Sequence, residues 1–152
     1  MSSSYIETEI QKVVSSEEYP KNISLASAWI IAHFKGINIK IYDMQDSSSL
    51  CDYNIIASAE NTTQARAMID EIIKNLKPQN LDIISLEGMS DAEWILLDMG
   101  DVIIHIFQEI SRDVFDLDSL WHKFDQVTIP QEYYFGQAPE VKKEEDSGLN
   151  YF

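Results

Sequence analysis

The amino-acid sequence predicts an α/β fold in which a mixed sheet of five strands is flanked by helices. Residues 37–42 alternate apolar and polar side chains, which is the period of a half-buried strand. Residues 65–76 repeat apolar side chains at helical spacing behind a capping sequence. Two apolar runs between residues 94 and 107 are separated by only two residues, as in a tight hairpin. Strands and helices mixed along the chain in this way are expected to pack as layers of one domain.

The beginning of the chain predicts an N-terminal segment followed by a helix. Residues 1–23 are expected to be either a loose segment or a short helix that ends near Pro20. Ser24 is a suitable N-cap for a helix over residues 25–35. Gly36 is a suitable residue to end that helix before the first strand.

The middle of the chain predicts a loop, a buried strand and a long helix. Residues 43–52 are polar and rich in serine, so they predict a loop before a second strand over residues 53–57. Asn61 and Gln64 have the spacing of a helix cap, and Pro78 ends the apolar repeat that follows them.

The remaining elements are a third strand, the hairpin and a final helix. The third strand is expected over residues 81–86. The hairpin strands are expected over residues 94–99 and 102–107. An amphipathic helix is expected over residues 113–121, which gives the element order α-β-β-α-β-β-β-α.

Composition changes after residue 124. Residues 125–152 are rich in Gln, Glu, Lys, Pro and Gly and carry isolated aromatic residues, but they lack a periodic apolar set. They therefore predict an acidic and mostly disordered tail, which leaves residues 24–124 as the folded domain.

Length and composition are those of one globular domain. The chain has 152 residues, of which 45% are hydrophobic, which is enough to bury an ordinary core. No apolar run approaches the roughly 18 residues needed to cross a bilayer, and the N-terminal sequence lacks the features of a signal or transit peptide. The single cysteine, Cys51, excludes an internal disulfide and fits a reducing compartment. We expect a cytoplasmic protein with no membrane association.

The net charge of −15 argues against direct binding of nucleic acid. The largest basic cluster is Lys142-Lys143, and three acidic residues follow it at once. An acidic surface suits a basic protein partner, although the charge is equally well explained by solubility alone.

The sequence offers no sound case for an enzyme, a metal site or a cofactor. Cys51 has no histidine nearby in the sequence, and the three histidines of the chain lack the spacing of zinc ligands. There is no glycine-rich phosphate loop. Asp98 and Asp101 could hold Mg²⁺, but both flank the predicted hairpin turn, where aspartate commonly accepts hydrogen bonds from the local backbone.

Two tryptophans are candidates for a core or an interface. Trp121 is expected in the core or at its edge, on a helix face with Val114, Leu117 and Leu120. Trp94 follows the polar run 90–93, so it could lie at the rim of the sheet, and tryptophan is enriched at interface hot spots.

Residues 93–107, EWILLDMGDVIIHIF, followed by Ser111-Arg112 and Leu120-Trp121, resemble the ribosomal silencing factor family, also called Iojap. Glu87-Gly88 also matches, and the resemblance covers about residues 24–121. One departure is the turn 58–61, which reads SAEN where the family usually has a T-G-x-S-like turn.

The resemblance implies a fold similar to that of nucleotidyltransferases, without their catalytic signature. It implies binding to ribosomal protein fourteen of the large ribosomal subunit, at the face that would meet the small subunit. A factor bound there would block subunit joining sterically and lower translation when nutrients are scarce. Members of the family commonly self-associate as dimers.

Carried over by position, the resemblance implies a set of partner-binding residues on the sheet surface. These residues are Trp94, Asp98, Met99, Gly100, Asp101, His105 and Arg112. Our hypothesis is that Trp94 and Met99 supply apolar area, while the two aspartates pair with lysine or arginine of the partner. The alternatives are a divergent enzyme on the nucleotidyltransferase fold and an acidic adaptor for another basic protein.

Overall fold

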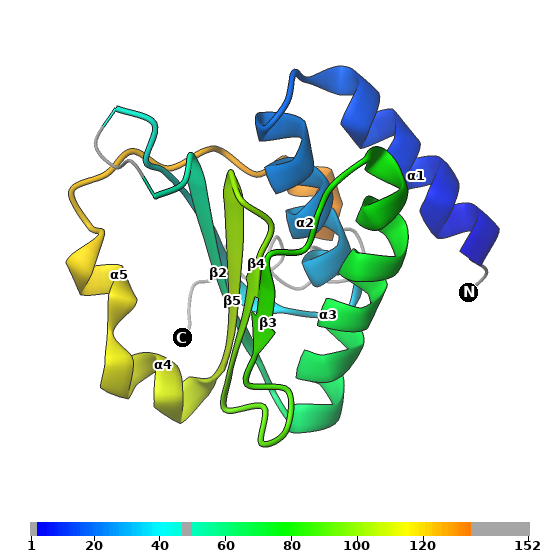
Figure 1. Cartoon of the computed structure of the whole chain (residues 1–152). Helices are drawn as coiled ribbons and strands as arrows, with labels where there is room; N and C mark the ends of the chain where they lie inside the picture. Colours follow the sequence, from blue (N-terminus) through cyan, green and yellow to red (C-terminus); the bar gives the residue numbers. More distant parts are fainter. Residues whose placement is uncertain (1–2, 47–49, 135–152) are drawn as a thin grey trace, which may run out of the picture.

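A computed structural model describes residues 3–46 and 50–134 and arranges them in three layers (Figure 1). Three helices cover one face of a central sheet, and two short helices stand against the other face. The first three are α1 (Ser3–Ser16), α2 (Lys21–His33) and α3 (Thr62–Leu76). The two short helices are α4 (Glu109–Phe115) and α5 (Leu117–Leu120). We call the α1–α3 side the first face and the α4–α5 side the second face.

The sheet has five strands in the order β1-β2-β5-β4-β3. The strands are β1 (Ile37–Asp43), β2 (Tyr53–Ala59), β3 (Ser85–Glu87), β4 (Trp94–Asp98) and β5 (Val102–Gln108). Strands β2 and β5 run parallel, and every other neighbouring pair is antiparallel. The predicted fold class, a mixed five-stranded sheet flanked by helices, is therefore confirmed, whereas the likeness to nucleotidyltransferases stays a prediction.

The main core lies between the first face of the sheet and helices α1–α3. Strand β2 lies between β1 and β5 and is buried at every residue, because both faces of the sheet are covered there. Its alternate residues Tyr53, Ile55 and Ala57 belong to the main core. Ile56 instead belongs to a second, smaller apolar cluster on the second face.

The N-terminal segment is a helix that packs on the domain. Ile6, Ile10 and Val13 repeat at helical spacing, are at most 8% exposed and join the main core. Helix α2 begins at Lys21, so Ser24 is fully buried inside the helix and does not cap it. The predicted N-cap was wrong because the helix begins nearly one turn earlier, with Pro20 as the residue that precedes its first turn.

Helix α3 begins and ends as predicted. The Asn61 side chain accepts a hydrogen bond from the backbone N–H of Gln64 (2.8 Å), which satisfies one of the free donors at the helix start. The Gln64 side chain in turn accepts one from the backbone N–H of Glu60 (2.6 Å). A 3-10 turn that contains Pro78 follows the helix.

The third strand is shorter than expected. Only Ser85–Glu87 pairs as β3, whereas the sequence predicts residues 81–86. The partner strand β4 has five residues and its last one, Asp98, pairs with Ser85, so the residues before Ile84 have no strand beside them.

The final helix is broken, and part of its predicted apolar face is exposed. Asp116 has a φ of 50°, a left-handed conformation that ends α4 and starts α5. Val114 is 71% exposed and Leu120 is 63% exposed, because α4 and α5 turn other side chains toward the sheet. The expectation of one helix was therefore wrong, but Trp121 lies at the edge of the second apolar cluster as expected, together with Leu117.

Residues 125–134 are ordered against the domain, so the predicted disorder is wrong for this part of the tail. β1 is an edge strand, and its free backbone groups pair with this segment. The backbone N–H of Asp43 donates to the carbonyl of Asp125 (2.8 Å), and that of Val127 donates to Ile41 (2.9 Å). Tyr133 then packs on the main core. The rest of the predicted tail lies outside the described residues.

Among the helices of the described ranges, none has the length and apolar character needed to cross a membrane.

Candidate partner-binding surface

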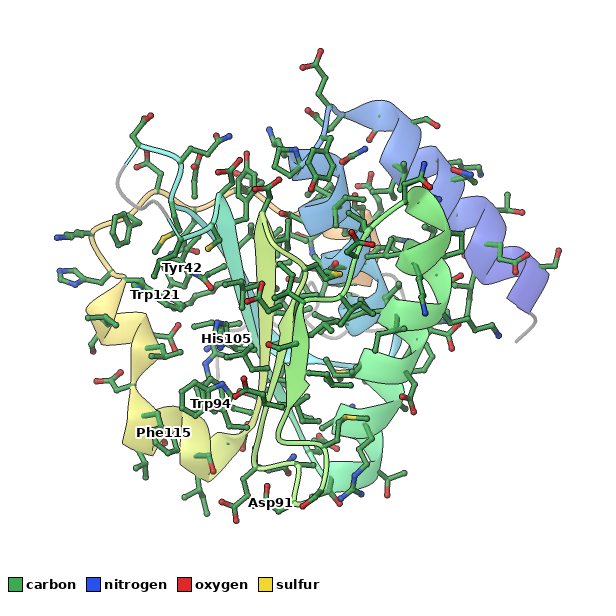
Figure 2. All side chains as sticks on the ribbon, viewed as in Figure 1. Tyr42, Asp91, Trp94, His105, Phe115 and Trp121 are labelled. Carbon is green, nitrogen blue, oxygen red and sulfur yellow. The ribbon has the colours of Figure 1, made fainter. Side chains whose placement is uncertain are left out.

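Alternation along β4 and β5 places a defined set of side chains on the second face. Because successive residues of a strand point to opposite faces, every second residue of each strand belongs to this face. The set is Trp94, Leu96 and Asp98 from β4, with Ile103, His105 and Phe107 from β5. Figure 2 shows the labelled members Trp94 and His105 on the side of the sheet that faces α4 and α5.

Aromatic rings fill much of the space between this face and the two short helices. Trp94 packs against Phe107 and Phe115, with ring centroids 4.9 and 4.7 Å apart. The other end of the row is closed by Trp121, which meets His105 at 5.5 Å and Tyr42 at 5.7 Å in edge-to-face geometry. We call these six rings the aromatic cluster.

A chain of hydrogen bonds runs through the aromatic cluster. The indole Nε1 of Trp94 lies 3.1 Å from Nδ1 of His105, and Nε2 of His105 lies 3.0 Å from Oδ1 of Asn54. An indole N–H can only donate, so Nδ1 of His105 must accept. The proton of the neutral ring is therefore on Nε2, which donates to Asn54. Burial lowers the pKa of His105 to about 4, so the ring is neutral at neutral pH.

Helices α4 and α5 carry large apolar side chains that are exposed. Ile110 is 79% exposed and Phe115 is 52% exposed, in addition to Val114 and Leu120. Exposed apolar side chains grouped in this way are typical of a binding surface. Exposed carboxylates stand among them: Glu109 and Asp113 on α4, and Asp116 between the two helices. The surface therefore combines apolar area with negative charge, which complements a basic protein.

Arg112 is an internal tie and not a surface residue. Its side chain is buried and donates two hydrogen bonds to Asp118, at 2.8 and 3.2 Å. It also donates to the carbonyl of Asn38 (2.8 Å) and the hydroxyl of Ser58 (3.0 Å). Tyr42 donates to the same Asp118 carboxylate at 2.9 Å. These bonds hold α4 and α5 against β1 and β2.

Burial alone would raise the pKa of Asp118. The hydrogen bonds from Arg112 and Tyr42, together with the positive charges of Arg112 and Lys40, outweigh burial and lower the pKa overall. Asp118 therefore stays ionised at neutral pH and can accept all of these bonds.

The hairpin turn lies at the far end of β4 from Trp94. Asp98 shares the second face with Trp94, roughly 13 Å along the strand at about 3.3 Å per residue. The Asp98 carboxylate accepts a hydrogen bond from the Gly100 N–H (2.9 Å), and Gly100 has the φ of 91° that glycine adopts readily. The Asp101 carboxylate accepts one from the Tyr19 hydroxyl (3.0 Å). Asp98 thus serves the turn, as one reading of the sequence expects, whereas the Asp101 carboxylate bonds to a residue far from the turn in the sequence.

The structure brings together only part of the predicted site. Trp94, Asp98 and His105 share one face, and Asp101 is exposed at its end. Met99 is 5% exposed and belongs to the main core, so it cannot supply apolar area to a partner. His105 and Arg112 are each 5% exposed, so they can act on a partner only through the residues that they hold.

Sequence reasoning missed several residues of this surface. They are Asn54, Leu96, Ile103, Ile110 and Phe115. Leu96 and Ile103 were predictable from strand alternation, since each lies two residues from a residue that was singled out. Phe115 had no such signal, because its position depends on the break in the helix at Asp116.

The described residues show no arrangement typical of catalysis or metal binding. In these ranges no three His, Cys, Asp or Glu side chains are grouped so that they could hold a metal ion. Burial raises the pKa of the Cys51 thiol to about 11, so it is a poor nucleophile at neutral pH. A groove of about 700 Å³ lies between α1, α2 and residues 130–133, away from the aromatic cluster.

These features describe an α/β domain with a surface suited to binding another protein. The model of the family "Ribosomal silencing factor during starvation" matches residues 16–149. The ribosomal silencing factor of Haemophilus influenzae is 34% identical over 87 residues, which cover 57% of this chain and 85% of that protein. The chain therefore belongs to the ribosomal silencing factor family.

Two further proteins are similar to this chain. A crystal structure of a Chromobacterium violaceum protein has a TM-score of 0.66 and 28% identity, and covers 76% of this chain and 99% of that chain. The mouse protein "Mitochondrial assembly of ribosomal large subunit protein 1" is 27% identical over 97 residues, which cover 56% of this chain and 42% of that protein. The general role of the chain is thus that of a ribosomal silencing factor.

Proposed function

We propose that this protein binds the large ribosomal subunit through ribosomal protein fourteen and blocks the joining of the small subunit by steric hindrance. It does so as a binding protein in the cytoplasm, without catalysis and without a cofactor. The proposal rests on the family and on one observation, the partly exposed aromatic cluster beside apolar, acidic helices.

Chemistry supports a basic protein as the direct contact. Trp94 and Phe115 offer apolar area of the kind found at interface hot spots. The exposed carboxylates of α4 and α5 would repel the phosphates of ribosomal RNA but attract lysine and arginine. Contact through a ribosomal protein therefore allows a chain with a net charge of −15 to attach to a particle made largely of RNA.

The first test is sedimentation of ribosomal subunits with the purified protein in a sucrose gradient, at a magnesium concentration that permits subunit joining. We expect the protein to migrate with the large subunit and the joined ribosome to decrease. A protein that stays at the top of the gradient while subunits join normally would refute the proposal. Co-migration without loss of joined ribosomes would instead point to an adaptor.

The second test locates the surface. Phe115→Ala should weaken binding to isolated ribosomal protein fourteen, because it removes half-exposed aromatic area next to Trp94. The matched control is Tyr5→Ala on α1, since Tyr5 is 49% exposed and Phe115 is 52% exposed. Equal affinities for the two variants would show that the contact lies elsewhere.

Trp94→Ala should have the larger effect. Loss of a buried interface anchor costs about 2 kcal/mol or more, which is a weakening of roughly 30-fold, mostly through faster dissociation. Surface plasmon resonance with immobilised ribosomal protein fourteen measures both rates. Unchanged binding by this variant would mean that the second face is not the contact.

The family also implies self-association. We infer that dimers, if they form, compete with ribosome binding only if they cover the second face. Analytical ultracentrifugation of wild type and Phe115→Ala tests this, and a dimer that persists in the variant would place the dimer contact on another face.

A further inference from the structure

We propose that His105 and Asn54 are positioning residues that hold the indole of Trp94 with its N–H turned inward, so that the partner meets only the apolar part of the ring. This inference rests on the proposed function, because it assigns a role in binding to side chains that touch no partner themselves.

The polar ring of His105 is energetically unfavourable to bury at its position. Its neighbours on the same face of β5 are Ile103 and Phe107, and it is itself 5% exposed. A polar ring buried among apolar side chains is unfavourable unless its nitrogens are hydrogen-bonded. Both ring nitrogens of His105 are hydrogen-bonded, one to Trp94 and one to Asn54. The hydrogen bonds thus account for a histidine at a place where an apolar residue would pack.

Donors and acceptors in this chain of hydrogen bonds can be assigned in only one way. Trp94 can only donate, so His105 must accept at Nδ1 and donate at Nε2. Asn54 accepts through Oδ1 and is also 5% exposed, so the bond between His105 and Asn54 is shielded from bulk water. The histidine tautomer, and with it the direction in which the indole N–H points, is fixed before any partner arrives.

The fixed orientation of the Trp94 indole affects the affinity for a partner. Trp94 is packed between the rings of Phe107 and Phe115 and is tied at its nitrogen, so its rotamer is set in the free protein. Ordering a free side chain at an interface reduces affinity by about 2- to 10-fold. Because the Trp94 indole is already ordered in the free protein, binding avoids this loss of affinity.

The bound state of the Trp94 N–H limits the chemical groups of a partner that can gain by contacting the ring. Because the indole N–H is already used, a carbonyl or carboxylate of the partner gains no hydrogen bond from Trp94. The groups that gain are an aliphatic side chain, or the cationic head of lysine or arginine against the ring. This matches the basic partner that the carboxylates of α4 and α5 favour.

The geometry can be tested without any partner. In the uniformly ¹⁵N-labelled full chain, the Trp94 Nε1 and His105 Nδ1 nuclei should show a ¹⁵N–¹⁵N coupling transmitted across the hydrogen bond. The His105 ring should show the Nε2-protonated tautomer in a long-range ¹⁵N–¹H spectrum. Absence of the coupling, or the other tautomer, would overturn the proposal.

The role in binding is tested with two substitutions at one position. His105→Phe keeps an aromatic ring like that of Phe107 but removes both hydrogen bonds, and should weaken binding to the large subunit by about 2- to 10-fold. His105→Asn is the rescue variant, because its side-chain oxygen can still accept from Trp94, and should bind more tightly than His105→Phe. Circular dichroism confirms that each variant is folded.

A double-mutant cycle separates positioning from general damage to the fold. In a Trp94→Phe background there is no indole N–H to hold, so His105→Phe should cause no further loss of affinity. An equal loss in both backgrounds would overturn the positioning role, even though the proposed function stands. Failure of the wild type itself to bind the large subunit would overturn the proposed function and this inference together, whatever the NMR geometry.

Discussion

His105 is a titratable residue at a place where its strand neighbours are apolar, and this couples the stability of the protein to pH. Its pKa of about 4 in the folded protein lies below the usual value of about 6.5 in an unfolded chain. Between these values the unfolded chain binds more protons than the folded one. The free energy of unfolding must therefore fall as the pH decreases from about 6.5 toward 4.

We expect this single residue to lower the free energy of unfolding by about 2 kcal/mol between pH 7 and pH 5. Urea unfolding of wild type and His105→Phe at both pH values measures the difference. The variant lacks the titrating ring, so its change should be smaller by that amount. Equal changes in the two proteins would show that His105 does not resist protonation.

Arg112 matches a position of the family motif, yet its side chain is buried within the domain. Its guanidinium joins α5, β1 and β2 through Asp118, Asn38 and Ser58. The family resemblance implied, by position, that Arg112 is a contact residue. The burial of the Arg112 side chain excludes a direct contact, and this burial depends on how the short helices fold back onto the sheet.

Arg112→Met should lower the free energy of unfolding by about 3 kcal/mol, because it leaves the Asp118 carboxylate without its main partner in a largely buried place. The control is Lys40→Met, which removes a partly exposed pair with the same carboxylate at 3.6 Å and should cost less than about 1 kcal/mol. Urea unfolding at pH 7 compares them, and similar losses would mean that the buried network is not what stabilises this layer.

At the scale of elements, the sequence predicted those whose signals are local. Helix α3 has its cap and its apolar repeat within one segment, and the β4–β5 hairpin has two apolar strands around a two-residue link. The missed features depend on distant partners. Residues 125–134 are ordered because they meet the free edge of β1, which lies more than 80 positions earlier in the chain.

The candidate site follows the same division. Trp94 and Asp98 were predicted for one surface, and strand alternation places both on the same face, since they lie four residues apart. The same alternation places Met99 on the opposite face from Asp98, so the prediction for Met99 could have been rejected from the sequence. Asn54 could not have been found, because its role exists only through the pairing of β2 with β5.

Helix α1 is expected to be part of the cooperative fold. Ile10 is 2% exposed in the main core, so Ile10→Ala should lower the free energy of unfolding by about 3 kcal/mol. The neighbouring exposed residue provides the control, since Gln11→Ala should change it by less than about 0.5 kcal/mol. A single urea transition is the readout, and an unchanged midpoint for Ile10→Ala would mean that α1 docks without stabilising the domain.

At the scale of the whole molecule, charge governs how fast a partner is met. A net charge of −15 creates a long-range field that attracts a basic protein and is screened by salt. The aromatic cluster, by contrast, interacts with a partner only once the two proteins are in contact. Association and dissociation should therefore respond to different parts of the surface.

Asp101→Asn and Asp113→Asn should each flatten the salt dependence of the association rate with ribosomal protein fourteen and leave the dissociation rate nearly unchanged. The control is Asp70→Asn, an exposed carboxylate on α3, which makes the same change in net charge on the first-face side. Stopped-flow association between low and high salt measures the slopes. If all three variants have the same slope, net charge alone steers the encounter and neither position belongs to the contact.

The burial of Cys51 has a practical consequence for labelling the protein. With its pKa near 11 and its side chain in the second apolar cluster, the only native cysteine of the chain should not react with maleimide at neutral pH. A cysteine introduced at Gln11 would then be the single reactive thiol. Because α1 stands on the opposite side of the sheet from α4 and α5 (Figure 1), a fluorophore there would travel with the protein onto the ribosome while leaving the aromatic cluster uncovered.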